Sequence, residues 1–378
     1  MTIGEEIRAA RARAGMTLRK LETETGIDHT VLSRMESGYR RVSSDELFTL
    51  AEALGVTTGD LLGRPERSEV LAVAGRLGAD AHADFLVPAV ERVTQVLEMA
   101  DLLDRVVGPD RSPLAPQVAR PAGGAARAQG RKLAEAARAA FGLGQGPAAE
   151  LRQLLEERLG AMVVTQPVAG DVHGLCVRAG STAVVMINTN DRWARQRWTA
   201  AHELAHLLMD DLAVYEVTRS GTARSASETR ADAFAAHFLA PDDALRAFVA
   251  GRDLDGPGVA AVMDYFGLSM EAACNRLVDL KVLAAPAAAE LRANGVRSAV
   301  SAAQLSDAFD RRAAEAEGVR IPPTRLLRRA LSAYQAGRVG IGVVGAVLGE
   351  ADLAALRRRL EAEDIRPPVI DSDAGALL

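Results

Sequence analysis

Apolar residues recur every three to four positions over most of this chain, a spacing that is typical of amphipathic helices. Residues 1–63 divide into short stretches of this kind, which we interpret as a bundle of five helices. The stretches are separated by glycines at expected helix ends, namely Gly15, Gly26, Gly38 and Gly55. The same spacing returns in residues 64–107, where it predicts a helical segment that connects domains or mediates dimerisation.

The pattern changes after residue 107, where proline, glycine and alanine replace large apolar residues. Residues 108–130 therefore predict a flexible linker, because so few large side chains cannot offset the entropy lost on ordering. Residues 131–284 begin with two helical stretches and continue with alternating or β-rich runs, which predict a small sheet. The predicted strands are 161–166, 174–178 and 183–188.

Helical spacing resumes near Trp193 and continues to the end of the chain. Residues 285–378 are predicted to form a helical C-terminal extension, with a disordered tail in the last ten residues, which are rich in small and acidic groups. The predicted fold class is therefore mainly α with a small β-sheet (α+β). It consists of an N-terminal five-helix bundle, a second domain that contains the sheet, and the helical extension.

The composition narrows the function classes. A chain of 378 residues with 48% hydrophobic residues can form two or three domains, and a net charge of −5 argues against coating nucleic acid through charge alone. No apolar run reaches the roughly 20 residues that cross a bilayer, and the N-terminus lacks the apolar core of a signal peptide. The two cysteines, Cys176 and Cys274, cannot build a disulfide framework. We expect a cytoplasmic protein without membrane contacts.

The segment TLRKLETETGIDHTVLSRMESGYR has the pattern of a helix-turn-helix motif. Thr17 opens the first helix, Gly26 marks the turn, and Asp28 caps the second, which would be the recognition helix. Side chains on and just after this helix are the candidates for contact with bases or phosphates of a double-stranded DNA operator. They are His29, Thr30, Ser33, Arg34, Tyr39, Arg40 and Arg41.

The charge of this region leaves a second interpretation open. Residues 1–63 contain 8 basic and 10 acidic residues, a net charge of −2, so one copy should bind DNA weakly and the bundle could instead serve protein contacts. However, L-x-x-x-x-G-I before the second helix and S-x-x-E-S-G-Y-R across its end resemble the XRE/Cro family of helix-turn-helix domains. That resemblance covers nearly all of residues 4–62 and implies binding to operator DNA.

The sequence RWTAAHELAHLL contains the motif H-E-x-x-H, formed by His202, Glu203 and His206. Residues four apart share one face of a helix, so both imidazoles can bind one Zn²⁺ while Glu203 lies beside them. Catalytic zinc needs a third protein ligand, for which we choose Glu228 in SETRADAFAAHFLAP. Asp232, one turn further on, is placed to orient a ligating histidine.

The H-E-x-x-H residues and Glu228 also have purely structural interpretations. H-E-x-x-H also occurs in helices by chance, and Glu228 could be only the glutamate of a capping box opened by Ser225. Apolar neighbours indicate that the H-E-x-x-H helix is buried, where two unligated histidines would be costly. We reject His237 as a ligand because it falls on the opposite side of its helix, and keep His173 as a weak candidate for substrate or oxyanion contact.

Residues 131–283 resemble the ImmA/IrrE family of metallopeptidases. The family pattern has an aromatic residue before A-H-E-x-x-H, followed by E-x-x-A-x-x-F-A-x-x-x-L-x-P. The matching positions are Trp198, His202 to His206, Glu228, Ala231, Phe234, Ala235, Leu239 and Pro241. The resemblance implies a gluzincin-like fold with zinc on His202, His206 and Glu228, and with Glu203 as the catalytic residue.

The resemblance also implies a regulatory role, since family members cleave or otherwise inactivate a DNA-binding repressor in response to stress or mobile-element induction. We expect a DNA-binding transcriptional regulator with zinc-dependent endopeptidase activity, one Zn²⁺ per chain and a repressor as its protein substrate. A homodimer is a further expectation, and the same ligands also accept Mn²⁺ or Fe²⁺. The alternative is a transcriptional regulator that does not cut proteins, whose metal domain is structural or sensory.

Overall fold

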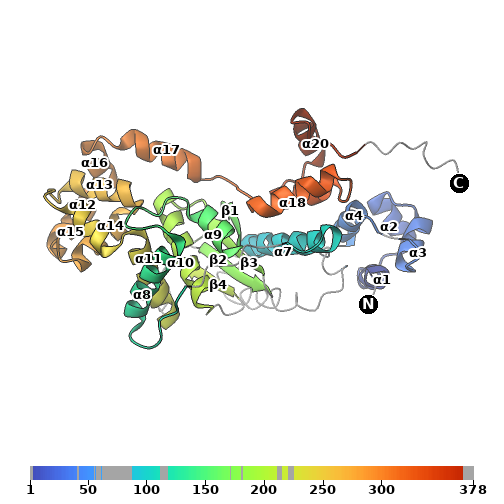
Figure 1. Ribbon diagram of the computed structural model, residues 1–378. Coiled ribbons are helices and arrows are strands. Elements are labelled where there is room, and N and C mark those ends of the chain that lie inside the picture. The colour runs from blue at the N-terminus through green and yellow to red at the C-terminus, as the bar shows by residue number, and fades with distance from the viewer. Residues whose placement is uncertain are drawn as a thin grey trace. The chain divides into compact units, whose positions relative to one another are not determined.

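A computed structural model describes residues 3–40, 42–54, 56, 61, 87–110, 118–170, 172–179, 182–210, 215–219 and 225–368 (Figure 1). The chain divides into two compact units. The first combines Met1–Ala83 with Val90–Arg111 and Pro322–Leu378, and the second consists of Asp84–Ala89 and Ser112–Ile321, as far as the structure describes them. Helices dominate and accompany one small sheet, which confirms the predicted fold class.

The N-terminal helices of the first unit have the predicted helix-turn-helix order. They are α1 (Ile3–Arg13), α2 (Leu18–Thr25), α3 (His29–Glu36) and α4 (Ser44–Leu54), packed around a core that includes Ile7, Leu21, Leu32, Met35 and Leu50. The Thr17 hydroxyl caps α2 by accepting from the backbone N–H of Lys20, and Gly26 ends α2 with φ of 70°. The fifth predicted helix falls largely outside the described residues.

Helices from the end of the chain belong to this same unit. They are α18 (Thr324–Gln335), α19 (Ile341–Leu348) and α20 (Leu353–Ala362), which join α7 (Val87–Val107). The Arg92 guanidinium on α7 donates to the carbonyl oxygens of Ala346 and Val347, the last turn of α19. Arg329 on α18 pairs with Asp104 at 2.7 Å. The predicted C-terminal extension is thus divided between the two units.

The second unit is built on a four-stranded sheet of order β1-β3-β2-β4. Strand β1 (Met162–Gln166) runs parallel to β3 (Thr182–Asn188), whereas β2 (Val172–Ala179) is antiparallel to both β3 and β4 (Tyr215–Arg219). The three predicted strands are present, and β4 is a strand that the sequence pattern did not indicate. Helix α10 (Trp193–Met209) packs against β2 and β3 (Figure 1).

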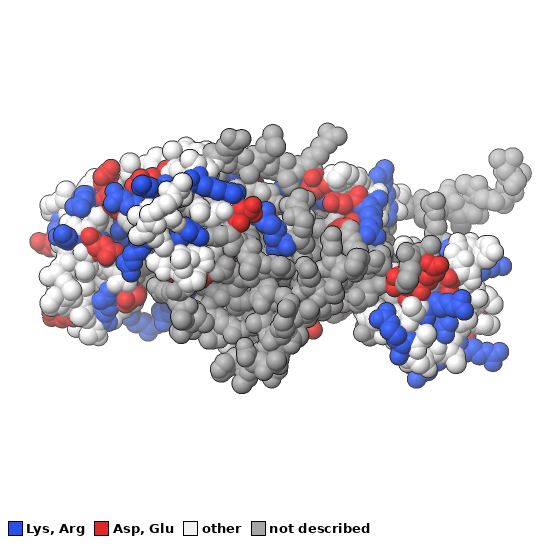
Figure 2. All heavy atoms as spheres, turned by 90° about the horizontal axis from the view of Figure 1, so that it is seen from below, with Lys and Arg blue, Asp and Glu red and all other residues white. Residues whose placement is uncertain are grey.

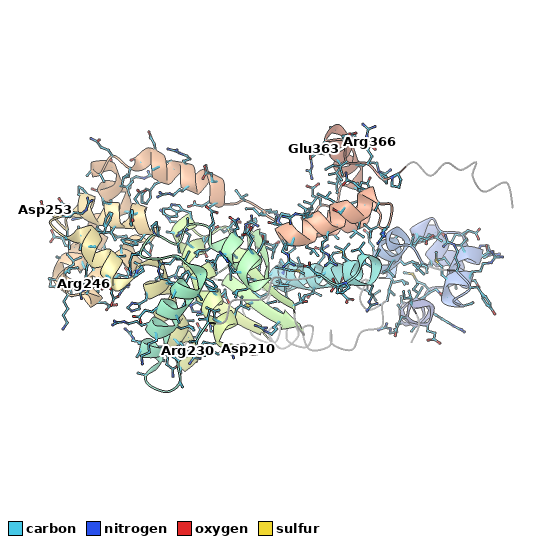
Figure 3. The ribbon with its side chains drawn as sticks, in the orientation of Figure 1. Asp210, Arg230, Arg246, Asp253, Glu363 and Arg366 are labelled. Carbon is cyan, nitrogen blue, oxygen red and sulfur yellow. The ribbon has the colours of Figure 1, made fainter. Side chains whose placement is uncertain are left out.

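Two further helices support α10. They are α8 (Ala126–Phe141) and α11 (Ala226–Leu239), which pack against each other, and α11 also packs against α10. Gly130 on α8 allows this approach, because a Cβ there would lie 2.2 Å from the carbonyl oxygen of Arg230. Gly130 was predicted to be linker, so helical structure begins earlier than the composition indicated. Figure 3 labels Arg230, whose guanidinium donates to the Gln129 amide oxygen at 2.8 Å.

The rest of the second unit is helical: α9 (Leu151–Leu159), α12 (Asp242–Val249), α13 (Gly256–Phe266), α14 (Met270–Asp279), α15 (Ala285–Asn294), α16 (Val296–Ala302) and α17 (Ser306–Ala316). Beyond α17, Ile321 pairs with Thr165 of β1 through two backbone hydrogen bonds of 3.0 and 3.1 Å. The last ten residues of the chain, predicted to be disordered, lie outside the described residues. Within the described part of the chain, no helix is both long and apolar enough to cross a membrane.

Candidate metal centre

Helix α10 brings His202 and His206 onto one face, as the four-residue spacing predicts. Both side chains are 1% exposed, and their Nε2 atoms are only 3.2 Å apart. Two buried imidazole nitrogens that face each other at this distance are suited to bind one metal ion. The helix ends at Met209, and its C-cap residue Asp210, labelled in Figure 3, adopts the left-handed conformation with φ of 56°.

Helix α11 adds the carboxylate of Glu228 to this pair. Its oxygens Oε2 and Oε1 lie 3.3 Å from Nε2 of His202 and 3.3 Å from Nε2 of His206, respectively. The Ser225 hydroxyl accepts from the Glu228 backbone N–H at 3.1 Å, so the expected N-cap is also present. Ser225 therefore caps the helix by binding the Glu228 backbone N–H, while the Glu228 carboxylate faces the histidines.

Asp232 lies one turn along α11, with Oδ1 3.3 Å from Nδ1 of His202. A carboxylate beside Nδ1 favours a proton at that nitrogen, which is the tautomer that leaves Nε2 available to a metal ion. Burial lowers the pKa of His202, but the neighbouring carboxylates of Asp232, Glu228 and Glu203 outweigh it and raise the pKa to about 9. The region thus has the negative potential that attracts a cation.

Glu203 is fully buried between α10 and the sheet. Strand β2 comes closest at Gly174, where a Cβ would lie 2.5 Å from Cγ2 of Thr199 and 3.0 Å from Oε1 of Glu203. Only glycine allows the strand to approach the acid this closely. The sequence interpretation used Gly174 only as a strand boundary, although a glycine inside a β-rich run is a recognised sign of close approach.

The other histidines of this unit have carboxylate partners of their own. Nδ1 of His173 lies 2.8 Å from Oδ2 of Asp191, and Nδ1 of His237 lies 2.9 Å from Oδ1 of Asp242. Across the described residues of this unit, His202, His206 and Glu228 are the group whose ligand atoms lie within 4.8 Å of one another. This arrangement can hold a metal ion with two nitrogens and a carboxylate.

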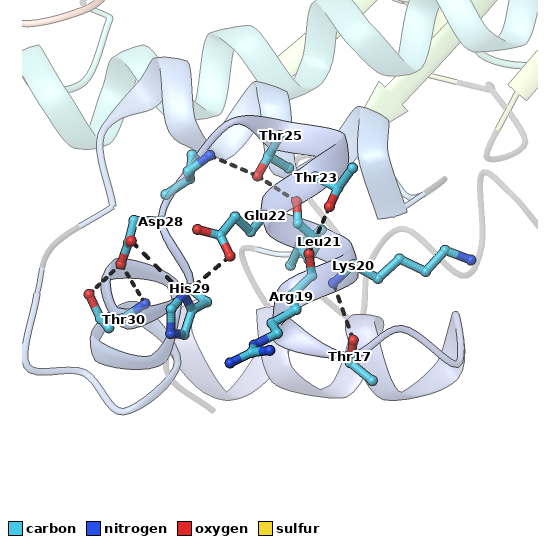
Figure 4. Close-up of polar contacts among 11 residues, drawn as sticks. Thr17, Arg19, Lys20, Leu21, Glu22, Thr23, Thr25, Asp28, His29 and Thr30 are labelled. Carbon is cyan, nitrogen blue, oxygen red and sulfur yellow. Dashed lines mark hydrogen bonds and ion pairs between the residues drawn. The ribbon is translucent and has the colours of Figure 1, made fainter.

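The predicted DNA-contacting residues lie on and after α3. Thr30, Ser33 and Arg34 are exposed, and Tyr39 is 88% exposed. Asp28 caps α3 by accepting from the N–H of Thr30, as Figure 4 shows. Two of the candidates, His29 and Arg40, lie beside acidic side chains.

Nδ1 of His29 lies 3.1 Å from Oε2 of Glu22, and Arg40 pairs with Glu46 at 2.8 Å. Acidic and basic side chains accordingly share the visible surface of the N-terminal helices (Figure 2). Arg41, the last predicted contact, lies outside the described residues. The described candidates for DNA contact are thus accessible to a partner, and two of them, His29 and Arg40, are paired with carboxylates.

Two family models match the chain. Residues 156–278 match the IrrE N-terminal-like domain of the M78 peptidases, and residues 7–61 match a helix-turn-helix domain. The chain joins an IrrE-like domain to a helix-turn-helix domain. The first match spans α10 and α11, and thus all three candidate ligands, and it indicates a metallopeptidase-type fold.

A curated relative points in the same direction for the DNA-binding part. The HTH-type transcriptional regulator ImmR of Bacillus subtilis (strain 168) is 33% identical over 69 residues, which is 18% of this chain. The match covers 54% of the length of that relative. Both resemblances expected from the sequence, to the XRE-type and the IrrE-like families, are therefore confirmed.

Proposed function

We propose that the IrrE-like domain is a zinc-dependent endopeptidase and that the helix-turn-helix domain makes the chain a DNA-binding transcriptional regulator. The single observation that supports the peptidase most strongly is the convergence of His202, His206 and Glu228. Their ligand atoms lie within 4.8 Å of one another. Glu203, which follows His202 in the sequence, is fully buried. We further propose a repressor protein as the substrate, in a stress or mobile-element response.

The donor set fits zinc of the catalytic kind. Two histidine nitrogens and one carboxylate leave a fourth position for water or substrate, whereas structural zinc sites are closed by four protein ligands. Asp232 supports the same assignment, since a carboxylate on the far nitrogen of a ligating histidine is the usual outer partner in zinc sites. The same ligands also accept Mn²⁺ or Fe²⁺, so metal selectivity is open to measurement.

In this proposal zinc, when bound, supplies a Lewis acid for the peptide carbonyl and lowers the pKa of a water molecule. Glu203 would serve as the general base that accepts a proton from the attacking water and as the acid that returns it to the leaving amine. The Gly174 backbone and Thr199 confine the Glu203 side chain, which limits the positions its carboxylate can take. Asp232 keeps the proton of His202 on Nδ1, so that Nε2 stays available as a ligand.

The geometry of the sheet limits where a peptide substrate can pair. Strands β2 and β3 each have a neighbouring strand on both sides, so neither offers a free edge to a substrate. Among the described strands the edges are β1 and β4, and Ile321 already pairs with β1. Strand β4, beside β2, is therefore the strand that we propose pairs with an extended substrate.

The decisive experiment compares cells that express the wild-type protein with cells that express the Glu203→Gln variant, in the organism from which the chain comes. New protein N-termini, identified by mass spectrometry, should appear with the wild type and be absent with Glu203→Gln, while both hold one zinc per chain. Glu157→Gln, an exposed glutamate on α9, is the matched control and should behave as the wild type. Equal cleavage by Glu203→Gln would refute the proposed role of this residue.

DNA binding has its own test. Arg34→Ala should weaken binding to an operator fragment and make the affinity less dependent on salt if it contacts a phosphate, because fewer counterions are then released. Arg158→Ala, an exposed arginine on α9 of the IrrE-like domain, removes the same charge and is the control. The acidic balance of residues 1–63 favours a homodimer on DNA, which sedimentation with the operator would detect.

A second candidate function is a regulator that binds DNA and never cuts a protein. The named regulator among the relatives favours it, although the match covers only 54% of that protein. In that case no new N-termini would appear with the wild type, and Glu203→Gln would control transcription as well as the wild type does.

A further inference from the structure

A cavity lies in the unit that contains the IrrE-like domain, apart from the candidate metal centre. Its volume is about 500 Å³, which suits a small organic molecule. Its walls come from α9, α10, α13 and α17, and its apolar surface includes Ile187, Trp193, Ala200 and Ile321. No role in metal binding or DNA binding accounts for it.

The cavity and the metal centre use opposite faces of α10. Trp193, Arg197 and Ala200 line the cavity, and their spacing of four and three residues places them on one face. At about 100° per residue, His202 is turned roughly half a revolution from this face. A molecule in the cavity would therefore contact the metal-binding helix without reaching the metal ligands.

The cavity is lined by three arginines, Arg152, Arg197 and Arg312, and by three acids, Glu150, Asp264 and Glu315. Arg197 donates to the backbone carbonyl oxygens of Ala149 at 2.5 Å and Gly267 at 3.3 Å, and both of these partners are neutral. Arg312 lies 5.1 Å from the centre of the Trp193 ring and pairs with Asp264 at 2.6 Å. These contacts hold both cations in place at the cavity wall.

The charge of Arg197 is only partly balanced. Burial and the nearby charge of Arg312 lower its pKa to about 10, while Glu150 acts in the opposite direction. Glu150 and Glu315 also line the cavity, but both are exposed to solvent, which screens them at the rim. The hydrogen-bond partners of Arg197 are backbone carbonyls, and an anionic group beside it would supply the counter-charge that they lack.

The cavity also touches the segment that leads out of this unit. Gln196 on α10 donates to the carbonyl oxygen of Ala316 at 3.2 Å, and the backbone N–H of Trp193 donates to Glu317 at 3.2 Å. Ile321, which lines the cavity and pairs with β1, is the last residue of the unit before the chain enters the one that contains the helix-turn-helix. A bound molecule would thus contact both α10 and this connecting segment.

We propose that this cavity binds a small amphipathic monoanion, an organic carboxylate with an apolar body. The carboxylate is held by Arg197 and Arg312, and the apolar body lies against Ile187, Ala200 and Ile321. The exposed rim acids disfavour highly charged anions such as nucleotides. Binding does not depend on peptidase activity, so the site stands or falls separately from the function proposed above.

The test uses the full-length protein, with octanoate as the probe and isothermal titration calorimetry as the measurement. We expect one octanoate per chain and a change in tryptophan fluorescence, since Trp193 lines the cavity. Octanol and octylamine have the same apolar body without the negative charge, and both should bind at least tenfold more weakly. Trp193→Phe should remove most of the fluorescence change but not the heat of binding.

Two variants test whether octanoate binds in this cavity. Arg312→Gln should weaken octanoate binding about tenfold, and Arg311→Gln, an exposed neighbour outside the cavity lining, should not change it. Ala316→Phe should abolish binding by filling the cavity from α17. The proposal is overturned if octanoate does not bind, if octanol binds equally well, or if neither Arg312→Gln nor Ala316→Phe reduces the affinity.

Discussion

Replacing Gly174 by alanine tests how closely the sheet packs against the candidate catalytic acid. The new Cβ would lie 2.5 Å from Cγ2 of Thr199, 3.0 Å from Oε1 of Glu203 and 3.3 Å from the carbonyl oxygen of Met186. Carbon atoms in contact normally stay about 3.5–4.0 Å apart, so roughly 1 Å must be gained by moving β2 or α10. Overpacking of a rigid interior costs about 1–3 kcal/mol.

Urea unfolding followed by tryptophan fluorescence measures this cost in the right part of the molecule. Both tryptophans, Trp193 and Trp198, belong to the second unit. With a slope of about 2 kcal/mol per molar urea, the midpoint should fall by roughly 0.5–1.5 M. The zinc content should not change, because no ligand is replaced, whereas cleavage should fall by up to about 100-fold, because a shift of about 1 Å moves Glu203.

The double variant Gly174→Ala with Thr199→Ala provides the control. It removes the closest contact, at Cγ2 of Thr199, and should therefore regain much of the stability that Gly174→Ala loses. The contact with Glu203 remains, so cleavage should stay impaired. A Gly174→Ala protein that unfolds at the wild-type urea concentration would refute the close packing described here.

Three further predictions concern the neighbouring charges. Burial lowers the pKa of His202, but Asp232 and Glu228 raise it to about 9. In the metal-free protein the His202 proton stabilises the fold fully below pH 6.5, and its contribution is lost as the pH rises through about 9. The melting temperature of the metal-free protein should therefore fall over this pH range, while the affinity for zinc rises. A melting temperature that does not change with pH would contradict this. Asp232→Asn should weaken zinc binding about 10- to 100-fold in competition with a chelator, and an unchanged affinity would exclude its orienting role. Arg276→Ala, which removes a buried partner of Asp242 and of the Ala240 carbonyl, should lower the free energy of unfolding by about 3 kcal/mol, measured in urea; a loss below about 1 kcal/mol would show that neither partner depends on it.

The geometry of the candidate metal centre was largely predictable because it is local. The spacing of His202 and His206 fixes their common face on any helix, and Glu228 with Asp232 repeats the same four-residue logic on a second helix. Long-range contact then brings the two helices together, and the sequence pattern alone could only propose it. In the structure α10 packs against α11, and Glu228 lies 3.3 Å from His202.

Features that depend on distant partners were harder to predict. Strand β4 is held by pairing with β2, and Gly130 belongs to a helix that is buried against α11, so local composition indicated neither. Periodicity identified the C-terminal helices but not their partners. Arg92 reaches across more than 250 positions to cap α19, a contact that no local rule reveals. The role of Gly174 likewise became visible only with Thr199 and Glu203 beside it.

The central claim is that His202, His206 and Glu228 bind one zinc ion with Glu203 beside it. X-ray diffraction of zinc-loaded crystals at the zinc absorption edge tests it most directly. We predict one anomalous peak per chain, about 2.0–2.2 Å from Nε2 of each histidine and from a Glu228 oxygen, with Glu203 not coordinated. A peak elsewhere, or a zinc ion at the two histidines that Glu228 does not bind, would contradict this account.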